Sequence, residues 1–130
     1  MHEAYSEVLI LLTLILLFSL LANTTSTIIF SIEKVYSSIV LMMVSSYLEY
    51  IINYCYLEGT LYSKNGIEYV VMLPSEVRIV SNNETSITVL YKCLSYTLNF
   101  KFNVYARAQG PIVIVEFTGN RVVVTGNKFS

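Results

Sequence analysis

Few residues in this chain could do acid–base or metal chemistry. The 130 residues include no aspartate, and His2 is the only histidine. A Ser-His-Asp triad needs both residue types, and structural zinc sites usually need four His or Cys ligands. Only two cysteines, Cys55 and Cys93, are present. We therefore expect no enzymatic activity, no bound metal and no cofactor.

The two cysteines have a second possible use, as a disulfide. Cys55 falls at the end of an expected helix and Cys93 in an expected strand. In an oxidising exterior, a bond between them would close a long loop and add about 2–4 kcal/mol of stability. Two buried free thiols are an equal alternative, and the sequence leaves both open.

Two N-x-S/T sequons offer sites for N-linked glycans, at Asn83 and Asn23. Asn83 lies in a polar segment, residues 81–85, that predicts an exposed turn. Asn23 lies between two apolar segments, where a packed assembly leaves little room for a sugar. We therefore expect a glycan at Asn83 in preference to Asn23.

Glu3 and Glu7 stand four residues apart, on one face of an expected helix and just before an apolar run. A carboxylate in apolar surroundings needs a partner, and the α-amino group of Met1 in a neighbouring subunit is one candidate. The alternative is that both are solvated acids, favoured by the helix dipole. The sequence allows either interpretation.

The elements that position these residues differ sharply along the chain. Hydrophobic residues make up 55% of it and charged residues 13%, about half the usual charge. All five glycines and both prolines follow residue 58, so nothing before that point forces a helix to stop. Residues 8–22 are uncharged, slightly fewer than the roughly 20 that a membrane span needs. Within this run we expect an assembly core of Val8, Leu9, Leu12, Ile15, Leu16, Phe18 and Leu20.

A removable signal peptide is a rival explanation for residues 8–22. Such a peptide needs a basic start, but no lysine or arginine precedes Lys34. An inserted helix also normally has basic residues on its cytoplasmic flank. We therefore favour a retained segment whose N-terminus faces outward, or one whose basic leader is removed before residue 1.

The apolar character resumes over residues 28–57, where polar residues recur at helical spacing. If residues 3–58 form one helix, it is about 84 Å long, too long for the remaining 70-odd residues to cover. Other copies of the chain, or a membrane, must then cover it. The polar positions that define the stripe are Lys34, Ser38, Ser45, Glu49 and Asn53.

Residues 59–130 instead predict short strands. Residues 61–63 and 67–72 flank Lys64-Asn65-Gly66, and Asn-Gly is a strong hairpin signal. Alternation of apolar and polar residues continues over 96–105. Further strands are expected at 77–80, 87–93, 112–117 and 121–125. The predicted fold is therefore α+β: a long helix, residues 1–58, followed by a small antiparallel sheet or sandwich, residues 59–130.

A long apolar helix free of glycine and proline, followed by a small β head, resembles the type IV pilins, particularly archaeal pilins and archaeal flagellins. The resemblance implies that a peptidase removes a leader, making Met1 the mature N-terminus. It also implies a membrane anchor before assembly and a homopolymeric cell-surface filament afterwards, used for adhesion or surface attachment. Bacterial members use a glutamate near the mature start. Here Tyr5 stands between Glu3 and Glu7, so neither is assigned that role.

Two other functions fit the sequence. One is a single-pass, membrane-anchored exterior β-domain that binds a partner, like the stator-like accessory proteins of archaeal surface filaments. The other is the coat protein of a filamentous or membrane-containing virus. Nucleic acid is an unsuitable partner, because the net charge is −1 and the eight basic residues are scattered.

Overall fold

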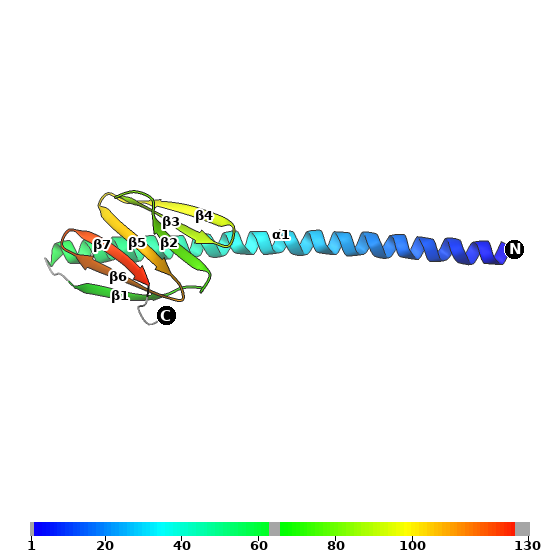
Figure 1. The fold of residues 1–130 in the computed structure, drawn as a ribbon, viewed down its shortest axis with the longest axis horizontal. Helices are drawn as coiled ribbons and strands as arrows, with labels where there is room; N and C mark the ends of the chain where they lie inside the picture. Colours follow the sequence, from blue (N-terminus) through cyan, green and yellow to red (C-terminus); the bar gives the residue numbers. More distant parts are fainter. Residues whose placement is uncertain (1, 63–65, 127–130) are drawn as a thin grey trace. The chain divides into compact units, whose positions relative to one another are not determined.

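The computed structural model describes residues 2–62 and 66–126. Within them lie one helix, α1 (His2–Leu61), and seven strands (Figure 1). The chain divides into two compact units, Met1–Tyr36 and Ser37–Ser130. The division falls inside α1, so the second unit contains the C-terminal part of the helix together with the whole sheet.

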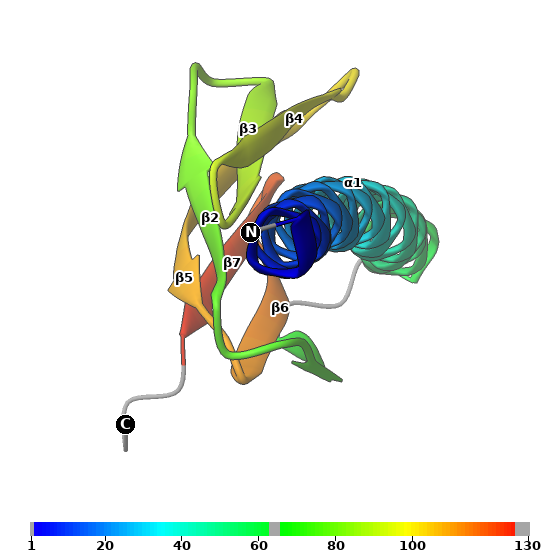
Figure 2. The same cartoon turned by 90° about the vertical axis from the view of Figure 1, so that its right-hand side faces the viewer.

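The second unit is built on a single seven-stranded sheet with the order β1-β6-β7-β5-β2-β3-β4. All neighbouring strands are antiparallel except the parallel pair β5 and β7. Figure 2 shows the strands beside the helix from its end. The strands are β1 (Ile67–Met72), β2 (Val77–Ser81), β3 (Ser86–Tyr91), β4 (Leu94–Asn99), β5 (Asn103–Gln109), β6 (Ile112–Thr118) and β7 (Arg121–Gly126).

One face of this sheet packs against the C-terminal part of α1. Leu48 and Ile52 are fully buried there, and the strands contribute alternate residues such as Val113 and Val115. Spacings of three and four residues place the buried helix positions on one stripe. The buried apolar helix positions are Leu41, Val44, Leu48, Ile52 and Cys55.

Aromatic contacts fix the end of the helix on the sheet. The rings of Tyr56 and Phe102 stack with centroids 3.9 Å apart, and Tyr56 meets Phe117 edge-on at 6.1 Å. A Cβ at Gly59 would lie 2.3 Å from the Phe117 ring. Glycine at residue 59 therefore allows the helix to approach β6 closely.

The expected polar stripe of the helix does not fully mark its exposed side. Ser45, assigned to the polar stripe, is buried, whereas the apolar residues Ile39, Met43 and Leu57 are exposed. A helix that is apolar around most of its circumference gives no clear signal for one face. The sheet, by contacting only one side, decides which residues are buried.

The predicted hairpin of residues 61–63 with 67–72 is wrong. Helix α1 continues to Leu61, and β1 pairs with β6, from Ile67 opposite Phe117 to Met72 opposite Ile112. Lys64 and Asn65, the first two residues of the expected turn, lie outside the described residues. The Asn-Gly signal is local, whereas the residues of β6 that pair with β1 lie 40 to 50 positions further along the chain.

The expected single strand over residues 96–105 is also wrong, because the chain leaves β4 at Asn99 and begins β5 at Asn103. Leu98, Phe100 and Val104 are all buried, so the alternation persists across the break. β4 lies at one edge of the sheet, whereas β5 lies between β7 and β2. The connection must cross from the edge to the centre, and a single strand cannot do so. The alternative of a two-sheet sandwich is not what the chain forms.

Candidate functional site

The N-terminal part of α1 exposes an extended apolar surface. Every side chain from Glu3 to Tyr36 is exposed. By length and composition, the helix Glu3–Leu61 can cross a membrane. No residue of its most apolar 18-residue stretch is buried. The residues expected to form an assembly core, Val8, Leu9, Leu12, Ile15, Leu16, Phe18 and Leu20, are each more than half exposed.

Three of the polar side chains on this surface are hydrogen-bonded within the helix. The hydroxyl groups of Thr13, Thr24 and Thr27 donate hydrogen bonds of 2.8–2.9 Å to the carbonyl oxygens of Leu9, Leu20 and Asn23. A hydroxyl already bonded to the backbone costs less to remove from water. These three threonines are therefore compatible with an apolar environment.

The two N-terminal glutamates, Glu3 and Glu7, lie on the first turns of α1 and are exposed. Neither forms an ion pair with another described residue. Met1, the expected source of a partner amino group, lies outside the described residues. Both interpretations of these acids thus remain predictions.

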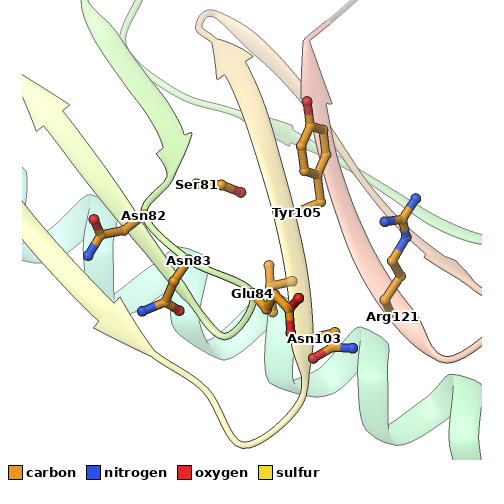
Figure 3. Close-up of a pocket in the computed structure, with 8 residues that line it drawn as sticks. Ser81, Asn82, Asn83, Glu84, Asn103, Tyr105 and Arg121 are labelled. Atoms are coloured by element: carbon orange, nitrogen blue, oxygen red, sulfur yellow. The ribbon is translucent and has the colours of Figure 1, made fainter.

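A polar hollow of about 390 Å³ lies where β2 and β5 separate. Ser81 ends β2, and its Oγ accepts a hydrogen bond of 2.8 Å from the backbone nitrogen of Ala106, in place of a strand-to-strand bond. Figure 3 shows the turn after β2 on one side and side chains of β5 and β7 on the other. The hollow is lined by Ser81, Asn82, Asn83, Glu84, Asn103, Val104, Tyr105 and Arg121.

The sequence pattern did not indicate this hollow. Its residues come from three segments that are adjacent only because β5 pairs with both β2 and β7. The cluster of polar residues at 81–85 was the only local signal. Arg121 contributes a cation above the Tyr105 ring, 6.0 Å from its centroid.

The two sequons occupy different surroundings. Asn83 is exposed in the turn between β2 and β3, and its Oδ1 accepts hydrogen bonds from the backbone nitrogen and Oγ1 of Thr85, at 2.9 and 3.3 Å. These bonds use the amide oxygen and leave the amide nitrogen, the atom that would carry a glycan, directed away from them. Asn23 lies within α1 on the exposed apolar segment.

The cysteines do not form the disulfide offered by the sequence, and only one of them is buried. Cys55 is fully buried in the core, whereas Cys93 is exposed. Cys93 lies in the turn between β3 and β4, beside Lys92 with a φ of 53°, and not within a strand. The strand was predicted two residues too long, because neither Lys92 nor Cys93 is a residue type that marks a turn.

This arrangement predicts unequal thiol reactivity. Burial first, and then the charges of Glu58 and Glu116, raise the pKa of the Cys55 thiol from 9.0 to about 11. Because the thiolate is the reactive form, we expect one thiol to react with a disulfide reagent in the native protein at pH 8, and two after unfolding. A native protein without reactive thiols, 2 Da lighter by mass spectrometry, would instead show the disulfide.

The same shift gives stability a pH dependence. The folded pKa lies above the unfolded one, so the stabilisation is fully present below pH 9 and is lost as the pH rises toward 11. Urea unfolding at pH 8 and pH 10.5 should show a loss of stability that is smaller in Cys55→Ala. An equal loss in both proteins would contradict this assignment.

Comparison with known proteins found no relative, because no family model, no curated protein and no solved structure matches the chain. The architecture is a long N-terminal helix followed by a seven-stranded, mostly antiparallel sheet, an α+β layout consistent with a pilin-like fold. The exposed apolar helix and the polar hollow are therefore the features that bear on function.

Proposed function

We propose that the chain is a structural subunit of an extracellular helical filament of the type IV pilus kind, used for adhesion or surface attachment. It polymerises with identical copies through the apolar N-terminal part of α1, which anchors it in the membrane before assembly. The observation that carries the proposal is the exposure of every side chain from Glu3 to Tyr36. Apolar surface of this extent is unfavourable in water, and association removes it.

The length of the exposed segment favours assembly over a simple anchor. No charged residue stands between Glu7 and Glu33, and residues 8–32 span about 37 Å at 1.5 Å per residue. That segment alone is long enough to span a bilayer core of about 30 Å. Val35, Tyr36 and Met43 are also exposed, and a bilayer that holds residues 8–32 leaves them in water. Packing against neighbouring helices would cover them.

Not every apolar residue of the segment 28–57 supports a filament, because some of them pack against the sheet of the same chain. Leu41, Leu48 and Ile52 are apolar because they pack against the sheet of the same chain. A membrane-anchored domain would need them equally. The residues of this segment that favour assembly over an anchor are the exposed apolar ones, such as Met43.

The second candidate function is a membrane-anchored exterior β-domain that binds a partner. The polar hollow beside Tyr105 and Arg121 favours it, since hydrogen-bonding groups and a cation there could hold a polar ligand. In that case α1 serves only as the anchor, and the chain remains dispersed in detergent.

Imaging of the full chain from the native cell surface distinguishes the filament subunit from the membrane-anchored domain. We expect uniform fibres by negative-stain microscopy, and mass spectrometry of the same material should find a glycan at Asn83 and none at Asn23. Detergent-dispersed single chains, without fibres after detergent removal, would support the anchored domain and overturn the filament. A glycan at Asn23 would contradict close packing of helices around that residue.

A further inference from the structure

All three arginines of the chain lie on the face of the sheet that points away from α1. They are Arg78 on β2, Arg107 on β5 and Arg121 on β7, and each is exposed. Alternate residues of the same strands, such as Ile79 and Val122, are buried in the core. None of the arginines forms an ion pair with another described residue, so their charges are available to a ligand. We call these three residues the arginine row.

The strand register sets the arginine row on a diagonal across β7, β5 and β2. Arg78 stands opposite Gln109, and Arg107 lies two residues before Gln109 on β5. Arg121 stands opposite Asn103, which lies four residues before Arg107. At about 3.4 Å per residue and about 4.8 Å between strands, the Cα atoms of Arg78 and Arg107 are about 8 Å apart, and those of Arg107 and Arg121 about 14 Å.

A hollow of about 340 Å³ lies at one end of the arginine row, lined by Arg78, Arg107 and Gln109 among others. The planar guanidinium group binds a carboxylate through two parallel hydrogen bonds, a geometry that the ammonium group of lysine lacks. The side-chain amide of Gln109 can both donate hydrogen bonds to hydroxyl groups and accept them. This end of the row therefore suits a ligand that carries carboxylates and hydroxyl groups together.

An aromatic side chain lies within the arginine row. Tyr105 is on β5, two residues before Arg107 and on the same face, and it is 45% exposed. Figure 3 shows its ring beside Arg121, whose guanidinium carbon lies 6.0 Å from the ring centroid. A tyrosine at a wet surface offers an apolar ring and a polar hydroxyl group together. A sugar ring, with C–H groups on its faces and hydroxyl groups at its rim, matches both.

The three strands that carry the arginine row contain no acidic residue. The nearest carboxylates along the chain are those of Glu76 and Glu84, which lie in the turns before and after β2. Glu84 lines the polar hollow together with Arg121, and Glu116 lies on β6, the strand beside β7. Arg121 is therefore the arginine whose charge is most offset, and we expect the other two to contribute most to binding.

We propose that the arginine row binds a single chain of a carboxylated polysaccharide. The proposal deepens the proposed function, because it names the class of molecule to which the filament attaches. It rests on that function only for the repetition of the site along a fibre, where many weak contacts add up to a strong attachment. A single subunit carries a complete row, so the binding itself does not require assembly.

The width of the arginine row favours one polysaccharide chain over other polyanions. Three strands are about 10 Å wide from the first to the third. An anionic membrane is a wider surface, and its phosphates would also meet Glu68 and Glu116, which are cross-strand partners on the same face. Single-stranded nucleic acid is usually bound by several aromatic side chains that stack on successive bases, whereas the row contains Tyr105 alone.

Binding of the full chain, in a non-ionic detergent at low salt, to immobilised polygalacturonate tests the proposal. We expect the wild type to bind this polymer and not its methyl ester, which keeps the sugar and loses the charge. The variant R78Q with R107Q should lower the association constant at least about tenfold, because it removes two charged forks. R78K with R107K keeps the charge without the fork, so it should restore only part of the binding. About 0.5 M salt should weaken the binding.

The matched control is K92Q with K101Q, which also removes two positive charges, at exposed positions outside the three strands. It should bind like the wild type. Equal losses in the two glutamine variants, equal binding of the methyl ester, or no binding by the wild type would overturn the proposal. Tighter binding to oligothymidylate, or to vesicles that contain phosphatidylglycerol, would overturn it in favour of nucleic acid or a membrane.

Microscopy separates this proposal from that of the filament. Normal fibres of R78Q with R107Q that no longer bind polygalacturonate, beside wild-type fibres that do, support both proposals. Wild-type fibres that fail to bind the polymer overturn the polysaccharide site and leave the filament standing. Wild-type chains that bind the polymer in detergent but form no fibres after its removal overturn the filament alone.

Discussion

Deletion of residues 1–36 is expected to convert the chain into a soluble, monomeric β-domain that forms no filaments. Residues 3–36, the part of the deleted segment whose burial the structure describes, contain no buried residue, whereas the core begins with Ser37 and Leu41. A chain that starts at Ser37 also begins its helix with a serine, a favourable N-cap residue. Folding should therefore survive while the assembly surface is lost.

Circular dichroism, sedimentation and negative-stain microscopy check this expectation, with the full chain in the same buffer as the control. We expect a cooperative thermal transition and a single species near monomer mass for the deletion. Filaments formed by the deleted chain would show that α1 before residue 37 is not the assembly element. A deleted chain without cooperative unfolding would show that the head needs the missing segment to fold.

A second prediction with a large expected effect concerns the buried residues of α1 that pack on the sheet. Leu48→Ala is expected to lower the free energy of unfolding of the head by about 2–5 kcal/mol, because Leu48 is fully buried and its loss leaves a cavity. Small domains are stable by only about 5–15 kcal/mol. A substitution of this size therefore removes a large fraction of the stability.

Leu57→Ala is the matched control, with the same residue types on the same helix. Leu57 is 55% exposed, so its truncation should cost well under 1 kcal/mol. Urea denaturation of the deletion protein, followed by circular dichroism, measures both variants without interference from assembly. Equal losses for the two leucines would mean that the helix does not bury the predicted stripe against the sheet.

The predictions for the deletion and for Leu48→Ala depend on different features of the chain, and the sequence predicts some of these features better than others. The absence of glycine and proline before residue 59 predicted a long helix, and α1 runs to Leu61. Strands were also expected at 112–117 and 121–125, and the structure contains them as β6 and β7. These patterns arise from local backbone preference and from side-chain periodicity, so they are visible in a short window.

The candidate sites were predicted less completely. Asn83 was expected in an exposed turn and lies in one, because polar residues favour turns locally. Cys93 was placed in a strand and lies in a turn, since neither Lys92 nor Cys93 marks a turn by type. The polar hollow was not expected, because its lining residues meet only through the pairing of β5 with two other strands.

The sequence by itself determined that an apolar helix precedes a small β head and that the head alone cannot cover the helix. Only the tertiary structure decided that Leu48 faces the sheet while Leu57 faces solvent, and that Glu68 stands beside Glu116. The physical reason is the range of the interactions. Helix and strand formation depend on neighbours within a few residues, whereas the buried face and the strand partners depend on contacts between segments far apart in the chain.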